Sequence, residues 1–125
     1  MSKPSAREQA LRALYAADIT KTDPDLDGLS TRARRYVEGT WHDREKLDAA
    51  ISAVATGWRL ERMPVIDRNI IRLALFELRS GQTPIGVTMN EAVNLAKGFS
   101  TERSGAFVNG VLARLAQAEE TTSAE

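Results

Sequence analysis

The sequence predicts an all-α fold that forms a single domain. Apolar residues recur at spacings of three and four along most of the chain, the pattern of helices that bury one face. Capping and breaking signals divide the 125 residues into six such segments, and no linker is long enough to separate two domains. The composition, 42% hydrophobic and 27% charged, is close to that of ordinary globular proteins. We therefore expect one domain over residues 1–125.

The first predicted helix covers residues 6–19. Ser5 and Glu8 form an S-x-x-E capping box, in which each side chain can bond the other residue's backbone amide. The segment 22–28 follows as a loop, because it combines a proline and a glycine with three aspartates that need solvent. The apolar face of the helix comprises Leu11, Leu14, Tyr15 and Ile19.

Two further helices are expected before the middle of the chain, over residues 30–41 and 43–57. A break near His42 separates them, and Gly57 is expected to end the later one. The apolar stripe of the later helix comprises Leu47, Ala50, Ile51, Val54, Ala55 and Trp58.

A fourth helix over residues 64–80 is expected to be the central one. Pro64 suits a first turn, where its missing N–H costs nothing, and Ser80 with Gly81 ends the helix. Its apolar residues cover more than one stripe, so it should pack on two sides. We expect its interleaved acidic and basic residues to form a solvated edge of mixed charge.

The last two helices are expected over residues 85–97 and 105–118. Gly98 is read as the stop of the first, and residues 119–125 as a frayed acidic tail. Asn109 and Gly110 form a hairpin signal, but helical spacing continues beyond them, so we favour a helix. Close helix packing would then explain Gly110.

Composition excludes several classes of protein. The 17 basic and 17 acidic residues give no net charge, which argues against coating nucleic acid by bulk charge but permits a local patch. The absence of cysteine removes disulfides, thiol catalysis and cysteine-ligated zinc. No apolar run is long enough to span a membrane, and the N-terminal residues lack a signal-peptide pattern. We expect a cytoplasmic protein.

Residues that could carry catalysis are sparse. His42 alone cannot supply a two-histidine metal site, and its position between helices suits a capping or surface role. The glycines form no phosphate-binding loop. We therefore expect a non-enzymatic binding protein without a cofactor. Basic residues in the first 22 positions offer a natural phosphate contact, whereas a solvated face is the simplest explanation of Arg32, Arg34 and Arg35.

Four segments, in order, resemble motifs of one protein family. Residues 89–99 read MNEAVNLAKGF, like the family's INEAVELAKxF helix, and residues 107–112 match its FVNGVL segment. Residues 65–78 are similar to its VDRAILRLAxYEL helix, and residues 10–15 to its A-x-x-ALY helix. On these segments the chain resembles the NusB family of bacterial transcription antitermination factors, least closely over residues 21–58.

The resemblance implies both a fold and a function. The fold would be two small helix bundles packed into one domain, with N-terminal helices over about residues 1–60 and C-terminal helices over residues 61–118. The function would be recognition of boxA, an element of ribosomal RNA transcripts, together with the ribosomal protein NusE. That complex helps RNA polymerase to resist termination.

The resemblance also assigns site residues. It places RNA-binding positions at Lys3, Arg7, Arg103 and Phe107, and a partner surface at Tyr15, Ile19, Glu61 and Asp67. Several family cations are missing, because Pro4 and Ser5 replace arginines while Gly86 and Ala106 replace lysines. Fewer phosphate contacts predict weaker and less salt-sensitive RNA binding, so we expect the partner to supply much of the affinity.

Structural explanations compete with these roles. Phe107 suits a core position, and Tyr15 could anchor the core with its hydroxyl at the surface. Glu61 and Asp67 could complement the start of the fourth helix, where negative charge is favourable. Asn90 and Asn109 are expected to join helices by hydrogen bonds.

Two other functions stay open. The chain could be an interaction module that homodimerises or docks a ribosomal protein with little direct RNA binding, which the missing cations favour. It could also be a fragment of a ribosomal RNA cytosine methyltransferase, some of which begin with a NusB-like domain, although no methyl-donor glycine loop is present.

Overall fold

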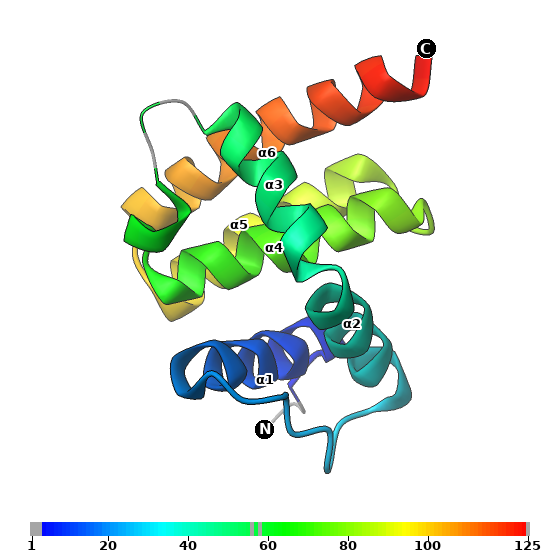
Figure 1. Ribbon diagram of the computed structural model, residues 1–125, viewed down its shortest axis with the longest axis vertical. Coiled ribbons are helices and arrows are strands. Elements are labelled where there is room, and N and C mark those ends of the chain that lie inside the picture. The colour runs from blue at the N-terminus through cyan, green and yellow to red at the C-terminus, as the bar shows by residue number, and fades with distance from the viewer. Residues whose placement is uncertain (1–3, 56, 58, 125) are drawn as a thin grey trace.

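The computed structural model describes residues 4–55, 57 and 59–124, of which 121–124 are described as helix only, and it confirms the all-α prediction (Figure 1). In this described part of the chain, every regular element is a helix and none is a strand. The elements are α1 (Ala6–Thr20), α2 (Thr31–His42), α3 (Arg44–Val54), the 3-10 helix η1 (Leu60–Arg62), α4 (Val65–Ser80), α5 (Ile85–Phe99) and α6 (Glu102–Ala124). The predicted residues Lys3 and Trp58 lie outside the described residues.

Serine caps start the first two helices. The Ser5 hydroxyl accepts the Glu8 amide at 3.1 Å, and the Ser30 hydroxyl accepts the Ala33 amide at the same distance. Each cap satisfies a backbone donor that has no partner within its helix, which fixes where α1 and α2 begin. The helix starts predicted from these serines are therefore confirmed to within one residue.

Four predicted helix boundaries are wrong. α3 ends at Val54, before Gly57, whereas α5 continues through Gly98 to Phe99. The sixth helix starts earlier than predicted, where the Thr101 hydroxyl accepts the Ser104 amide at 3.0 Å. It also runs into the residues expected to be a frayed tail, and an ion pair of 2.7 Å between Arg79 and Glu119 ties that extension to α4.

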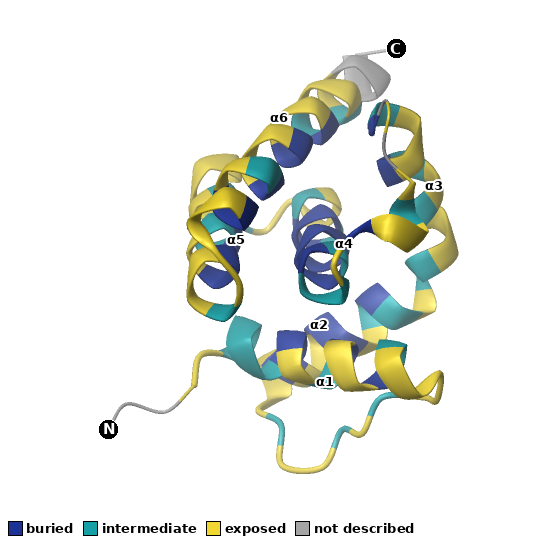
Figure 2. Ribbon diagram, turned by 90° about the vertical axis from the view of Figure 1, so that its left-hand side faces the viewer, coloured by how far each residue is buried: buried dark blue, intermediate teal, exposed yellow. Residues whose placement is uncertain are grey.

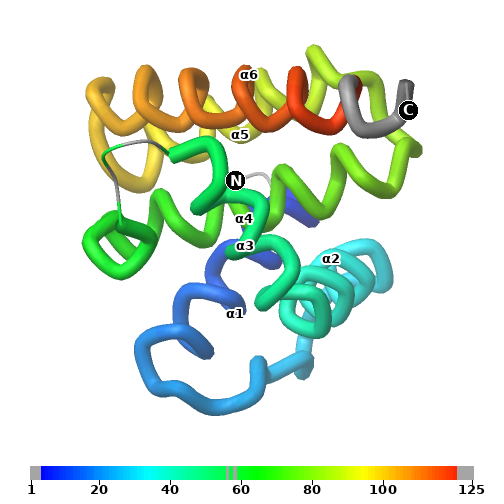
Figure 3. The backbone as a smooth tube through the Cα atoms, turned by 45° about the horizontal axis from the view of Figure 1, so that its top comes forward, coloured from blue at the N-terminus to red at the C-terminus, as the bar shows by residue number. Residues whose placement is uncertain are grey.

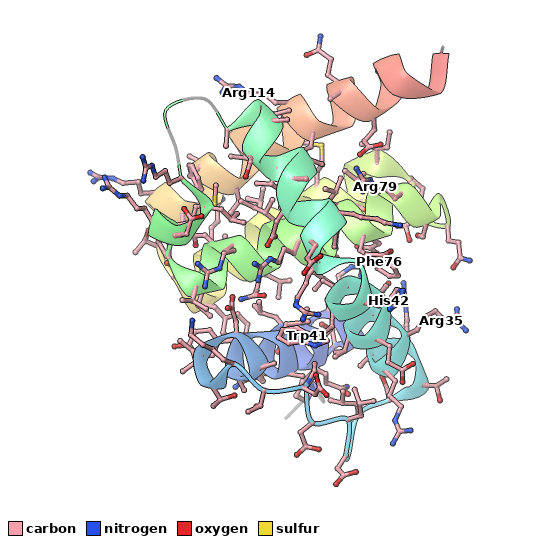
Figure 4. All side chains as sticks on the ribbon, in the orientation of Figure 1. Arg35, Trp41, His42, Phe76, Arg79 and Arg114 are labelled. Carbon is pink, nitrogen blue, oxygen red and sulfur yellow. The ribbon has the colours of Figure 1, made fainter. Side chains whose placement is uncertain are left out.

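Close helix packing involves a different glycine from the one predicted. Gly110 is helical, but a Cβ added there would meet nothing within 4 Å, so the packing explanation is wrong. A Cβ added at Gly39 would instead collide with the ring of Phe76. Figure 4 shows Phe76 where α4 meets α2, so Gly39 permits the close approach of these two helices.

Helix α4 occupies the centre of the molecule, as its apolar pattern predicts (Figure 2). The larger core cluster joins α4 to α3, α5, α6 and Leu11 of α1, and the smaller one joins it to α1 and α2. Leu73 belongs to the smaller cluster, and Phe76 packs against both. Because Leu47 and Ile51 of α3 lie in the larger cluster, the two cores do not divide the chain near residue 60.

The helices form two levels around this centre (Figure 3). α5 and α6 run beside each other on one side of α4, while α1 and α2 lie on the other side. Within the described residues, no helix is both long and apolar enough to cross a bilayer. The arrangement leaves the outer faces of α1 and α2 and the α5–α6 turn at the surface.

Candidate nucleic-acid interface

Arg7, a predicted RNA-binding residue, is held in an ion pair with Glu77 of α4. Its Nε donates to Oε2 of Glu77 at 3.1 Å, and its Nη2 donates to Oε1. The side chains are only 13% and 3% exposed, respectively. Hydrogen bonding to the buried carboxylate raises the pKa of the Arg7 guanidinium. Arg7 thus anchors the start of α1, and most of its charge is compensated inside the protein.

Tyr36 extends this pair to α2. Its hydroxyl donates to Oε1 of Glu77 at 3.1 Å and accepts a bond from Nε of Arg32 at 3.0 Å. The guanidinium groups of Arg7 and Arg32 also lie 5.9 Å and 5.5 Å from the centre of the Tyr36 ring, within the range of cation–π attraction. One buried carboxylate therefore organises the junction of α1, α2 and α4.

The remaining predicted RNA-binding residues lie on α6. Arg103 is exposed in its first turn, and Phe107 is half-buried against the larger core. Arg7 lies on α1 and Arg103 on α6, and no described side chain bridges the two cations. Arg12 approaches the α5–α6 turn instead, because its guanidinium lies 5.0 Å from the centre of the Phe99 ring. This contact places Arg12 of α1 near the turn that leads into α6, the helix that carries Arg103.

The predicted partner surface is partly formed. Tyr15 and Ile19, one turn apart on α1, are 38% and 53% exposed, and Glu61 is exposed on η1. Exposed large apolar side chains on a helix are typical of a protein contact. These three residues are available to a partner.

Asp18 fastens this part of α1 to α4. Its Oδ2 accepts bonds from Arg68 at 3.0 Å, Asn69 at 2.9 Å and Arg72 at 3.0 Å. Burial opposes ionisation of Asp18, but the bonds from Asn69 and Arg68 and the charges of both arginines outweigh it and lower its pKa. Arg72 also bonds both carboxylate oxygens of Asp48 on α3, at 2.6 and 2.7 Å.

Asp67 is buried, unlike the other predicted partner residues. It is 2% exposed, and its Oδ1 has no hydrogen-bond partner among the described residues. Burial raises the pKa of its carboxyl group, an effect that the Ser104 hydroxyl of α6 partly opposes. Its burial does not support a direct partner contact, because the start of α6 lies beside this turn of α4.

Two expectations about polar side chains are corrected. Asp67, Arg72 and Glu77 are buried, so α4 does not present a solvated edge of mixed charge. A helix with apolar residues on more than one stripe leaves little solvated face, so pairing of these charges could have been inferred. The Asn90 and Asn109 side chains are exposed and form no hydrogen bond among the described residues, so they do not join helices.

Comparison with known proteins agrees with this architecture. The model of the NusB family matches residues 4–117, nearly the whole chain. The chain belongs to the NusB family. A relative from Anaeromyxobacter dehalogenans, the transcription antitermination protein NusB, is 44% identical over 125 residues, covering 89% of this chain and 87% of its own. The NusB of Symbiobacterium thermophilum is also 44% identical, with 90% and 87% covered.

Solved NusB structures share the fold. NusB of T. maritima superposes with a TM-score of 0.81 at 35% identity, covering 94% of this chain and 93% of its own. A chain from the crystal structure of antitermination factors NusB and NusE in complex with double-stranded RNA gives a TM-score of 0.80. That chain is 25% identical, with 90% of this chain and 94% of its own covered.

Proposed function

We propose that this NusB-family chain is an RNA-binding transcription antitermination factor that recognises boxA RNA of ribosomal RNA transcripts together with NusE. The observation that carries the proposal is the family match over residues 4–117. The likeness to a chain crystallised with NusE and double-stranded RNA supports the choice of partners. The role is non-enzymatic, needs no cofactor, and implies action in the cytoplasm within an RNA polymerase antitermination complex.

On the RNA side, we assign direct contacts to Lys3, Arg103 and Phe107. The exposure of Arg103 and the partial exposure of Phe107 support this assignment, since single strands bind through cations and stacking on aromatic rings. We assign Arg7 to positioning, because its charge is compensated by Glu77. Its anchor would hold the start of α1 in position for RNA.

On the protein side, we assign the NusE contact to Tyr15, Ile19 and Glu61. Arg68 bonds both Asp18 of α1 and the backbone carbonyl of Leu60 in η1, so it links the helix that carries Tyr15 and Ile19 to the element that carries Glu61. Exposed apolar side chains and an exposed carboxylate on these elements offer both burial and a polar rim. Asp67 is buried, so it would affect NusE binding only through the packing of α4 against α6.

Fluorescence anisotropy tests the proposal. A labelled boxA strand and a scrambled strand of equal composition are titrated with the chain, with and without NusE, at low and physiological salt. We expect a preference for boxA that strengthens when NusE is present. Equal binding of the two strands in the presence of NusE would contradict the proposal.

A second function has one observation in its favour. Exposed Tyr15 and Ile19 also suit a module that homodimerises or docks a ribosomal protein with little RNA contact. NusE binding without any boxA preference would favour it, and a dimeric mass in solution that NusE dissociates would place the homodimer on the same surface.

A further inference from the structure

We propose that Arg32 and Arg35 of α2 form a phosphate-binding site for the RNA backbone, beside the anchor of Arg7 on Glu77. The site deepens the proposed function and rests on it. Neither arginine was assigned a role from the sequence, where a solvated face was the simplest explanation. Three features of their surroundings distinguish them from ordinary surface arginines.

The first feature is a hollow of about 240 Å³ at the junction of three elements. α2 contributes both arginines and Tyr36, and α4 contributes Glu77 and Ser80. Gln82 and Thr83, from the connection between α4 and α5, complete it. The Tyr36 and Ser80 hydroxyls already donate to Glu77, so the Thr83 hydroxyl and the Gln82 amide are the neutral side-chain donors that the hollow offers to an anion beside the two cations.

The second feature is the fixed position of Arg32. Its Nε is bound to the Tyr36 hydroxyl at 3.0 Å, and its guanidinium lies 5.5 Å from the centre of that ring. Its Nη1 and Nη2 make no hydrogen bond within the described part of the chain. Two parallel N–H donors are what a phosphate group accepts from arginine.

The third feature is the local charge. Arg35 is exposed, forms no ion pair with any described carboxylate, and projects outward from α2 in Figure 4. The carboxylate of the hollow, Glu77, already accepts bonds from Arg7 and the Tyr36 hydroxyl. Its charge is thus compensated by Arg7, and both α2 arginines contribute uncompensated positive charge.

The RNA backbone is the occupant that these features favour. Hydrogen bonds through Tyr36 and Glu77 link Arg32 in the hollow to Arg7 at the start of α1. A strand bound at the start of α1 could continue over α2. The site would replace some of the phosphate contacts that the missing cations at Pro4 and Ser5 would otherwise supply.

The test compares variants of the same helix in the presence of NusE. Arg32→Ala/Arg35→Ala removes the site, Arg35→Ala removes half of it without breaking the bond to Tyr36, and Arg34→Ala is the matched control. Arg34 is exposed on α2 but does not line the hollow. Anisotropy titrations with boxA RNA at several salt concentrations give the affinity and its salt dependence.

If each arginine neutralises one phosphate, the double variant should lose about 1.4 from the slope of log K against log salt. It should also bind roughly tenfold more weakly at physiological salt. Arg35→Ala should lose about half of that slope, and Arg34→Ala should match wild type. Circular dichroism of each variant confirms that the helices are retained.

Losses of affinity and slope that are equal in Arg34→Ala and Arg35→Ala would overturn the site, since they would reflect only general charge. Wild-type affinity and slope in the double variant would also overturn it while leaving the proposed function intact. Absence of RNA binding by the wild-type chain with NusE would overturn the proposed function and this site with it.

Discussion

The pairing of Arg7 with Glu77 gives this residue a structural role beside the RNA-binding one that the resemblance implies. The resemblance places Arg7 among RNA-binding positions, and the structure buries most of its side chain against a carboxylate. Spacing along a helix cannot reveal such a pair, because its members are 70 positions apart in the chain. Burial of both partners makes the pair sensitive to the loss of either one.

Glu77→Gln tests the anchor. The substitution leaves the Arg7 guanidinium buried without a countercharge, so we expect the free energy of unfolding to fall by about 3 kcal/mol in urea denaturation. Glu119→Gln is the control, because it removes the partly exposed pair with Arg79 and should cost less than about 1 kcal/mol. Equal losses in the two variants would show that burial adds nothing to the Arg7 pair.

Asp67 should make stability depend on pH in the opposite sense to most carboxylates. Its pKa is raised on folding, so its ionisation opposes folding, and stability is lost as the pH rises through the folded pKa. We expect Asp67→Asn to be more stable than wild type at neutral pH, by on the order of 1 kcal/mol. The gain should vanish near pH 3, where both states are protonated in wild type. Thermal unfolding across this range measures it, and a gain independent of pH would contradict the assignment.

At the scale of the helices, the two starts capped by serine are easier to predict than the ends. Ser5 and Ser30 bond the backbone of their own helices, so local sequence suffices to identify them. A glycine stop needs a left-handed backbone, which Gly81 adopts with φ of 68° and which Gly98 does not. Whether a glycine turns or continues depends on tertiary packing, so the extent of α5 and α6 could not be obtained from the sequence alone.

Gly39→Ala tests the crossing of α2 and α4. Alanine normally favours a helix, but here its methyl group would force the Phe76 ring to move. We expect a net loss of about 1–2 kcal/mol in the free energy of unfolding. The same change at Gly110, where the added methyl meets nothing, should stabilise the protein by about 0.5–1 kcal/mol. Chemical denaturation of both variants gives the comparison, and a gain at Gly39 would refute the close crossing.

For the whole molecule, the family resemblance predicts more of the architecture and function than the periodicity of apolar residues does. Periodicity predicts six helices and a central α4, but only the family motifs indicate two bundles, RNA and NusE. Even the motifs could not show that Asp67 is buried, because its exposure depends on where α6 packs against α4. Burial is a property of the assembled helices, and a single sequence contains no direct measure of it.

Ile19→Glu tests the surface proposed for NusE. The side chain is 53% exposed, so the charge should alter stability little while weakening NusE binding at least tenfold, about 1.4 kcal/mol. Val87→Glu introduces the same charge at another exposed apolar position, on α5, and should bind NusE as wild type does. Isothermal titration calorimetry gives both dissociation constants. Similar weakening by both changes would remove α1 as the specific contact.

The central position of α4 has a consequence for how the molecule opens. Its Leu73 belongs to one core, its Ile70 and Leu75 belong to the other, and Phe76 packs against both. If either bundle lost its packing, apolar residues of α4 would be exposed to water. The two bundles should therefore unfold in one cooperative step. The amides of α4 should then exchange with deuterium only through global unfolding, more slowly than those of any helix at the periphery.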